Sequence, residues 1–357
     1  MNLIKPRAPA GQPGATAPLP DAPHRTTPAA WLSRRSRDLA PLIVLMVLVV
    51  FFSLAAPTTF LSPLNLRNVL AQVATLAVVS TGVTFVLLLG EIDLSIASMA
   101  TMTGVIATML YEGARFALPM GQVALQLPMI PSVLVAWSIA VALGAFSGLV
   151  ATRVGVPTFM TTLAMLQITD GIALYWTKGS IKYTVPPILT SLGSDYIGPL
   201  PAVVVVAAVV LLIGHLVLTQ TRFGRYVYMT GASREAAELS GVNTRRVVLT
   251  CFALTALLAG LAGMLNVGRL GSAQAYGLSD MLLDSIAAAV LGGTSLFGGE
   301  GGIPNTIIGL LIFGVLNNGL NLIQVDIYLK PWVRGVILLI ALVINVYALR
   351  LRTRASR

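Results

Sequence analysis

Runs of about twenty apolar residues recur along this chain of 357 residues, and they restrict its possible folds more than any other feature. One run, residues 201–219, reads PAVVVVAAVVLLIGHLVLT and contains no Asp, Glu, Lys or Arg. A segment of about eighteen or more apolar residues with few charges is typical of a transmembrane helix. Charged residues make up only 10% of the chain, against about 25% in soluble globular proteins. We therefore expect an all-α, polytopic membrane protein.

The apolar runs predict about ten transmembrane spans within residues 39–350. No interval between them is long enough for a separate soluble domain, so these residues are expected to form one transmembrane domain. The expected spans are 39–56, 69–89, 92–110, 132–151, 158–176, 201–219, 248–267, 281–297, 304–323 and 331–349.

Both ends of the chain differ from this domain in composition. Residues 1–30 hold seven of the 20 prolines together with many alanines, and such a segment cannot bury a core. We expect a disordered cytoplasmic tail over residues 1–38 and a basic cytoplasmic C-terminus over residues 351–357. More apolar runs follow the first one, so the first run is expected to remain as an anchor and not to be removed as a signal peptide.

The basic residues are distributed unevenly between the two sides of the predicted membrane. With the N-terminus inside, the cytoplasmic segments hold 16 of the 23 Lys and Arg residues, and the outside loops hold the other seven. Lys and Arg are enriched in cytoplasmic loops, so we expect both termini to lie in the cytoplasm. The net charge of +10 is then a sign of topology, and no nucleic-acid partner is expected.

Small residues recur at a spacing of four within two of the spans. Gly144 and Gly148 form one such pair, and Ala256 and Gly260 form another. Small residues at this spacing let helix backbones approach closely in lipid, so we expect close helix packing at these positions.

The chain offers little material for catalysis or metal binding. It has one cysteine, Cys251, and two histidines. The phosphate-binding motif G-x-x-x-x-G-K-[ST] does not occur in the sequence. We therefore expect no catalytic residues, no cofactor and no metal site, and any ATP hydrolysis must come from a partner.

Two acids interrupt the apolar pattern in LLLGEIDLSIAS, residues 87–98. An ionised carboxylate at the centre of a membrane helix costs about 2.5–3.5 kcal/mol, so Glu91 and Asp93 should not face lipid. In one hypothesis Asp93 caps the third span and Glu91 meets water or an arginine. In the other, Glu91, Asp93 and the neighbouring Ser95 line or gate a path through the membrane.

Glycines interrupt the region of the eighth and ninth spans in LGGTSLFGGEGG, residues 291–302. Irregular backbone at membrane depth occurs only where it is enclosed by protein or lines a cavity. Interrupted spans in a transporter often mark the substrate pathway, and the alternative is a tight turn at the membrane interface. The candidate residues for this break are Gly292, Gly293, Gly298 and Gly299.

The longest cytoplasmic connection, residues 220–247, contains a pattern typical of a short helix. Ser233 is a good N-cap, REAAEL contains good helix formers, and Gly241 can end the helix in a left-handed conformation. The segment is either a basic loop that fixes the topology or a docking helix for a cytosolic partner, whose alanines let another surface come close.

Three stretches resemble the ribose-type sugar permeases, which are the membrane subunits of ATP-binding-cassette importers. They are LLLGEIDLSIAS, MTGASREAAELSGVNTRRV and AAAVLGGTSLFGGEGGIPNTIIGLLIFGVLNNGLNLI. The resemblance implies a type II-like importer permease in a bacterial inner membrane, in contact with lipid and paired with a second permease copy. It also implies cytosolic ATP-binding subunits and a sugar-binding protein outside the membrane. The family's coupling role falls on Arg234, Glu235, Ala236, Ala237, Leu239, Ser240 and Gly241.

The implied function is import of a sugar of pentose or hexose type. A neutral, hydroxyl-rich substrate needs hydrogen-bonding groups along its path, and the candidates are Thr75, Thr84, Asn317, Asn318 and Asn321. The alternative function is that of an ion-coupled secondary transporter that uses Glu91, Asp93 or Asp170 as its proton site. Relatives usually carry a second glycine in place of Glu91, and many carry a basic residue in place of Asp170.

Overall fold

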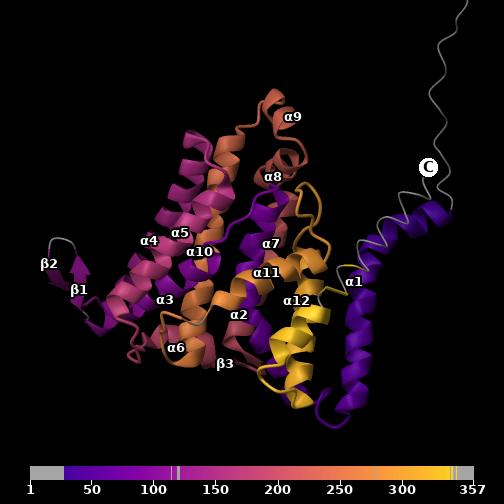
Figure 1. The fold of residues 1–357 in the computed structure, drawn as a ribbon, viewed down its shortest axis with the longest axis horizontal. Coiled ribbons are helices and arrows are strands. Elements are labelled where there is room, and N and C mark those ends of the chain that lie inside the picture. Colours follow the sequence, from indigo (N-terminus) through magenta and orange to yellow (C-terminus); the bar gives the residue numbers. More distant parts are fainter. Residues whose placement is uncertain are drawn as a thin grey trace, which may run out of the picture.

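The computed structural model describes residues 28–113, 115–118, 121–276, 278–337, 339–340 and 343. Helices dominate this part of the chain (Figure 1), as the sequence predicts. The helices are α1 (Pro28–Ala55), α2 (Pro63–Leu88), α3 (Ile96–Glu112), α4 (Met129–Leu149), the π-helical turn η1 (Val150–Val154), α5 (Thr158–Thr177), α6 (Pro187–Ser194), α7 (Ala202–Gln220), α8 (Arg222–Ala232), α9 (Arg234–Leu239), α10 (Thr244–Leu270), α11 (Ser279–Leu291) and α12 (Ile303–Leu322).

Each of the first nine predicted spans coincides with a helix over much of its length. Within the described part of the chain, five helical segments are long and apolar enough to cross a membrane: α2, α4 with η1, α7, α10 and α12. The predicted tenth span is helical over residues 330–337. Helix α1 begins at Pro28, inside the segment predicted as a tail, while residues 1–27 and the basic C-terminus lie outside the described residues.

The eighth span is shorter than the sequence predicts. Helix α11 has 13 residues, which correspond to about 20 Å of helix, whereas the hydrocarbon core of a bilayer is about 30 Å thick. The prediction of a span over 281–297 is therefore wrong in its last part. The helix ends at Leu291 with Gly292 as its C-cap, and glycines with positive φ then turn the chain. They are Gly293, Gly298, Gly299, Gly301 and Gly302, and this conformation is strained for other residues.

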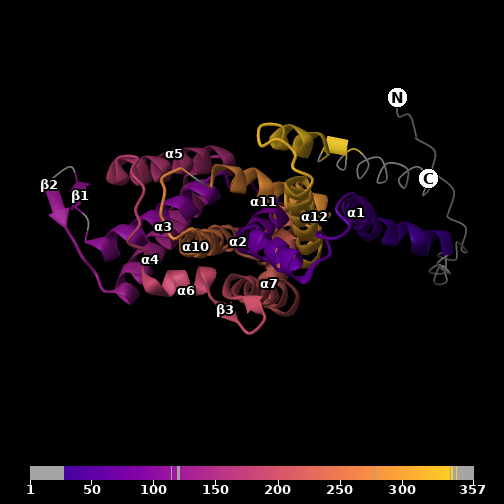
Figure 2. The same ribbon diagram turned by 90° about the horizontal axis from the view of Figure 1, so that it is seen from below.

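Helix α10 forms the centre of the molecule. It packs against α2, α3, α4 and α6. In Figure 2, α5 and α11 lie on one side of the row formed by α10 and α2, and α6 and α7 lie on the other side. The buried side chains of this core are mainly Ala, Val, Leu and Met.

Small residues permit the close contact between α4 and α10. A Cβ added to Gly144 would lie 2.3 Å from the Cβ of Ala256, and one added to Gly148 would lie 2.9 Å from the Cα of Leu249. Gly260 packs against Trp137 and Thr103, and an added Cβ there would lie 3.0 Å from the Trp137 ring. The predicted close packing at these glycines is confirmed.

The two ends of the helix bundle differ in structure. Helices α8 and α9 lie at one end, called here the α9 end, and α6 and strand β3 lie at the other (Figure 1). Two short antiparallel hairpins, which the sequence analysis did not predict, follow α3 and α6. Their strands are β1 (Arg115–Leu118), β2 (Gly121–Ala124), β3 (Tyr196–Ile197) and β4 (Leu200–Pro201).

Candidate functional site

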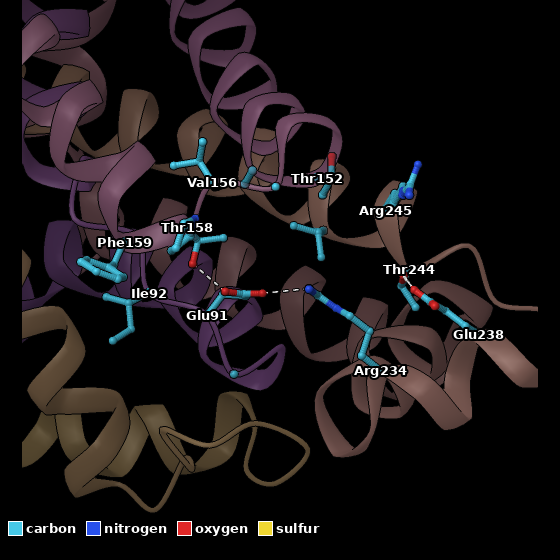
Figure 3. Close-up of a pocket in the computed structure, with 15 residues that line it drawn as sticks. Glu91, Ile92, Thr152, Val156, Thr158, Phe159, Arg234, Glu238, Thr244 and Arg245 are labelled. Atoms are coloured by element: carbon cyan, nitrogen blue, oxygen red, sulfur yellow. Dashed lines mark hydrogen bonds and ion pairs between the residues drawn. The ribbon is translucent and has the colours of Figure 1, made fainter.

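Segments that are distant in the sequence surround a cavity of about 500 Å³ at the α9 end. Its walls come from the connection between α2 and α3, from η1 and the start of α5, and from α9 and the start of α10 (Figure 3). The cavity is called here the α9 cavity. It brings Glu91 together with Arg234 and Glu238 of the predicted docking segment.

Local hydrogen bonds define both ends of α9. The hydroxyl of Ser233 accepts a hydrogen bond from the backbone N–H of Ala236 at 3.2 Å. At the other end Gly241 has φ +82°, its N–H donates to the carbonyl of Glu238 at 2.9 Å, and the N–H of Val242 donates to the carbonyl of Ala237 at 3.0 Å. This pattern is a Schellman motif. The predicted N-cap and the predicted glycine end are therefore confirmed, and the helix between them has six residues.

The two alanines of α9 point in different directions. Ala237 is only 1% exposed and packs in a cluster with Val247, Val248 and Phe252 of α10. The expectation that both alanines face a partner is wrong for Ala237, because this chain already covers it. Through Ala237 this short helix packs against the body of the protein. Its free face presents Leu239, which is 85% exposed, next to the exposed Ala236.

Glu91 connects three segments at the edge of the α9 cavity. Its Oε1 lies 2.8 Å from Nη2 of Arg234, and its Oε2 accepts a hydrogen bond from the hydroxyl of Thr158 at 2.5 Å. Figure 3 shows both contacts. The hypothesis that Glu91 meets an arginine is confirmed. The carboxylate links the α2–α3 connection to α9 and to the start of α5.

Asp93 is buried and forms a turn before α3. Its Oδ1 accepts one hydrogen bond from the backbone N–H of Ser95 at 2.9 Å and another from the Ser95 hydroxyl at 2.7 Å. The N-cap position of α3 is occupied by Ser95, whose side chain makes no capping bond. The prediction that Asp93 caps the helix is wrong, because its bonds close an Asx turn two residues onward. The pair still fixes how the chain enters α3.

The glycine-rich break packs against α8 and the end of α2. The N–H of Gly299 donates to the carbonyl of Leu88 at 2.9 Å. A Cβ added to Gly231 would lie 1.8 Å from that same carbonyl oxygen, and one added to Gly298 would lie 2.8 Å from the backbone N of Gly90. Of the two open alternatives, this geometry favours a tight turn at the end of the bundle. Gly292, Gly293, Gly298 and Gly299 are absent from the walls of the α9 cavity.

Tyr228 of α8 also holds the glycine-rich break in place. Its hydroxyl donates to the carbonyl of Gly301 at 2.8 Å. Burial raises the pKa of Tyr228 above its usual value, so the hydroxyl keeps its proton and remains a donor at neutral pH. The break, α8 and the end of α2 therefore form one connected unit.

Three of the predicted path residues make structural contacts instead of facing a cavity. Thr84 is buried, with its hydroxyl 2.7 Å from that of Thr306 on α12. The side-chain amides of Asn65 and Asn318 exchange two hydrogen bonds of 2.9 Å. Asn321 accepts a hydrogen bond from Nζ of Lys330 at 2.6 Å. These contacts tie α2 to α12 and α12 to the segment that follows it.

The other two path candidates, Thr75 and Asn317, line a second cavity of about 240 Å³ between α2, α10, α11 and α12. It lies near the end of α10 that is distant from α9, and it is called here the polar pocket. The rest of its polar lining is not evident from the sequence, since a polar residue in a span does not by itself show which way it faces. The polar lining residues are Gln72, Thr75, Asn266, Arg269, Asp284 and Asn317.

Comparison with known proteins identifies relatives along most of the chain. A protein-family model described as "Branched-chain amino acid transport system / permease component" matches residues 65–342. The chain is 36% identical over 326 residues to the ribose import permease protein RbsC of Escherichia coli, covering 88% of this chain and 94% of the relative.

Other relatives show similar coverage. The ribose import permease protein RbsC of Bacillus subtilis is 37% identical over 321 residues, which cover 87% of this chain and 92% of the relative. The xylose transport system permease protein XylH of Escherichia coli is 27% identical over 83% of this chain and 88% of the relative. No solved structure shows a significant match.

Proposed function

Because the chain belongs to the family of branched-chain amino acid transport system / permease components, we propose that it is the membrane-spanning subunit of an ATP-driven importer of a small sugar. The observation that carries this proposal is the 36% identity to a ribose import permease over 94% of that relative's length. Relatives named for allose and xylose transport support a sugar of pentose or hexose type. The protein has no catalytic residues of its own in this proposal, and a partner ATPase supplies the energy.

The α9 end faces the cytoplasm in the proposed arrangement, in a bacterial inner membrane. The placement of 16 of the 23 basic residues in cytoplasmic segments supports this orientation. The turn around Arg153 and the segment of α8 and α9 belong to those segments, and both border the α9 cavity or lie next to it. Both termini are then cytoplasmic. The sugar-binding protein docks at the opposite end, and a second permease copy completes the path.

The ATPase contacts the free face of α9 in this proposal. Leu239 supplies an apolar contact, and Ala236 leaves room for the partner's surface. Glu235, Ser240 and Gly241 lie next to this face. Arg234 and Ala237 act on the inner side, because Arg234 pairs with Glu91 and Ala237 packs on α10. A movement of α9 therefore reaches α10 through the packing of Ala237, and reaches α5 through Glu91, which bonds both Arg234 and Thr158.

Reconstitution in proteoliposomes tests the function. The permease is combined with the ATPase and the sugar-binding protein of its own system, and uptake of radiolabelled D-ribose, D-xylose and D-allose is measured. Uptake of at least one sugar should require ATP and should persist after the proton gradient is collapsed. Uptake that survives ATP removal but stops with the proton gradient would support the ion-coupled alternative.

A further inference from the structure

The polar pocket has a composition that is unusual for the interior of a helix bundle in a membrane. Six polar side chains from α2, α10, α11 and α12 surround about 240 Å³. The same lining includes Leu76, Met281 and Phe313, so the pocket combines apolar walls with a few converging polar groups. Ligand sites have this character, and polar groups at membrane depth often mark a substrate path.

Hydrogen-bonding capacity in the pocket is only partly used by the protein. Arg269 is the clearest case, because its Nε is buried without a hydrogen-bond partner among the described residues. Its Nη2 makes one long contact of 3.4 Å with the side-chain oxygen of Asn266. A buried donor without a partner costs free energy, and a ligand with hydroxyl oxygens would satisfy it.

Charge in the pocket is partly balanced within the protein. Asp284 lies 3.1 Å from Nη1 of Arg334, and their side chains are 15% and 23% exposed, respectively. This pair leaves the carboxylate able to accept further hydrogen bonds, since each oxygen has two acceptor sites. Asn317 and Gln72 each add an amide that can both donate and accept. Such alternating donors and acceptors match vicinal hydroxyl groups, each of which also donates and accepts.

We propose that the polar pocket is a binding site for a neutral monosaccharide within the permease, which holds the sugar after its release at the end distant from α9. The volume lies below the ~300–1,000 Å³ of sites for drug-sized ligands, which suits a single sugar unit. The inference rests on the proposed function and adds a specific sugar-binding site to it. It assigns Asn317 and Thr75 to sugar contact.

The test compares Asn317→Leu, which keeps the side-chain size but removes the amide, with Asn321→Leu on the same helix. Asn321 bonds Lys330 and is not part of the pocket lining. Uptake of D-ribose, D-xylose and D-allose is measured in the reconstituted system, together with ATP hydrolysis stimulated by the binding protein. Asn317→Leu should lower uptake of the best sugar about threefold to tenfold, as for the loss of one or two hydrogen bonds, with ATP hydrolysis within twofold of wild type.

The relative uptake of the three sugars provides the second readout. These sugars differ in their hydroxyl groups or in one CH₂OH group, so Asn317→Leu should change their ratio, whereas Asn321→Leu should not. If uptake of all three sugars is unchanged, or if all three fall by one factor together with ATP hydrolysis, the pocket is a packing feature and the inference is wrong. Thr75→Val repeats the test if Asn317→Leu yields too little protein. Absence of uptake by the wild type would instead contradict the proposed function.

Discussion

At the scale of single residues, Glu91 and Asp93 have different tasks although they are two positions apart. Glu91 bonds to two other segments through its two oxygens. Among the described residues, Asp93 bonds within its own turn, to Ser95. The first acid therefore joins parts of the molecule, and the second shapes the backbone locally. The cost of placing an ionised carboxylate in lipid predicted that both avoid it, but the sequence could not assign these separate roles.

Replacing Asp93 should destabilise the protein. In Asp93→Ala the hydroxyl and the backbone N–H of Ser95 lose their buried acceptor, at a cost of about 1–3 kcal/mol. Thermal unfolding of the purified protein in detergent should show a lower midpoint and a lower folded yield. Asp93→Asn keeps an oxygen at the same position and serves as the control. Equal stability of Asp93→Ala and wild type would contradict the assigned turn.

Replacing Glu91 should affect stability much less. The partner Arg234 is 51% exposed, and exposed ion pairs contribute about 0.2–1 kcal/mol. Glu91→Gln should therefore leave the folded yield close to wild type. The same variant should weaken the link between α9 and α5, and stimulation of ATP hydrolysis by the binding protein should fall. Thr158→Val removes the other contact of Glu91 and should also lower the stimulation of ATP hydrolysis. A large loss of folded protein in either variant would show that the link is structural.

At the scale of elements, α9 shows what a short sequence pattern can and cannot predict. Ser233 and Gly241 marked its ends correctly, because capping depends on neighbouring backbone groups alone. Which face is buried depends on α10, whose position relative to α9 is a property of the tertiary fold. The proposed docking surface therefore consists of Leu239 and Ala236 in place of the two alanines.

This assignment predicts opposite outcomes for two substitutions in α9. Leu239→Glu should leave the protein folded, because Leu239 is 85% exposed, but the co-purified ATPase should fall about tenfold, as expected for the loss of one apolar contact of about 1.5 kcal/mol. Ala237→Arg should instead reduce the folded yield, since it places a charge in an apolar cluster. Normal ATPase binding by folded Leu239→Glu would contradict the docking surface.

Helix α11 shows a second limit at the same scale. Its apolar pattern continues through Leu296 and Phe297, so the run length overestimated the helix. Gly292 and Gly293 follow the last helical residue, and Gly293 adopts a positive φ that turns the chain out of the helix. The many glycines in this stretch indicated a break in the helix. They could not show that the break packs against α8 and α2, because that contact depends on where the tertiary fold places those helices.

At the scale of the whole molecule, the order of the long apolar helices followed from the apolar runs, while the shorter helices α6 and α8 and the internal surfaces did not. In a soluble protein a polar face marks the exterior of a helix. In a membrane both the lipid-facing and the buried faces are apolar, so polarity does not show which face of a helix is buried. Gln72, Asn266 and Asp284 of the polar pocket were missed for this reason, and the hairpins were missed because they are only two to four residues per strand.

The orientation of the whole molecule can be tested by thiol labelling. In a Cys251→Ala background, Ser240→Cys at the α9 end should be protected from an impermeant thiol reagent added to intact cells. Tyr183→Cys, at a position 72% exposed near the other end, should react. Permeabilised cells provide the control, because both positions should react there. The reverse pattern in intact cells would invert the proposed topology.

The close backbone approach at Gly231 has a consequence for genetic variation. At five glycines an added Cβ would lie within 1.9 Å of a backbone carbonyl oxygen, and every other amino acid carries a Cβ. Even the smallest missense change at these codons therefore requires neighbouring segments to separate. In a saturation-mutagenesis library selected for growth on the transported sugar, these five codons should retain almost only synonymous variants, while the exposed Gly171 of α5, where an added Cβ meets no neighbour, should accept alanine. The five positions are Gly231, Gly263, Gly268, Gly292 and Gly309.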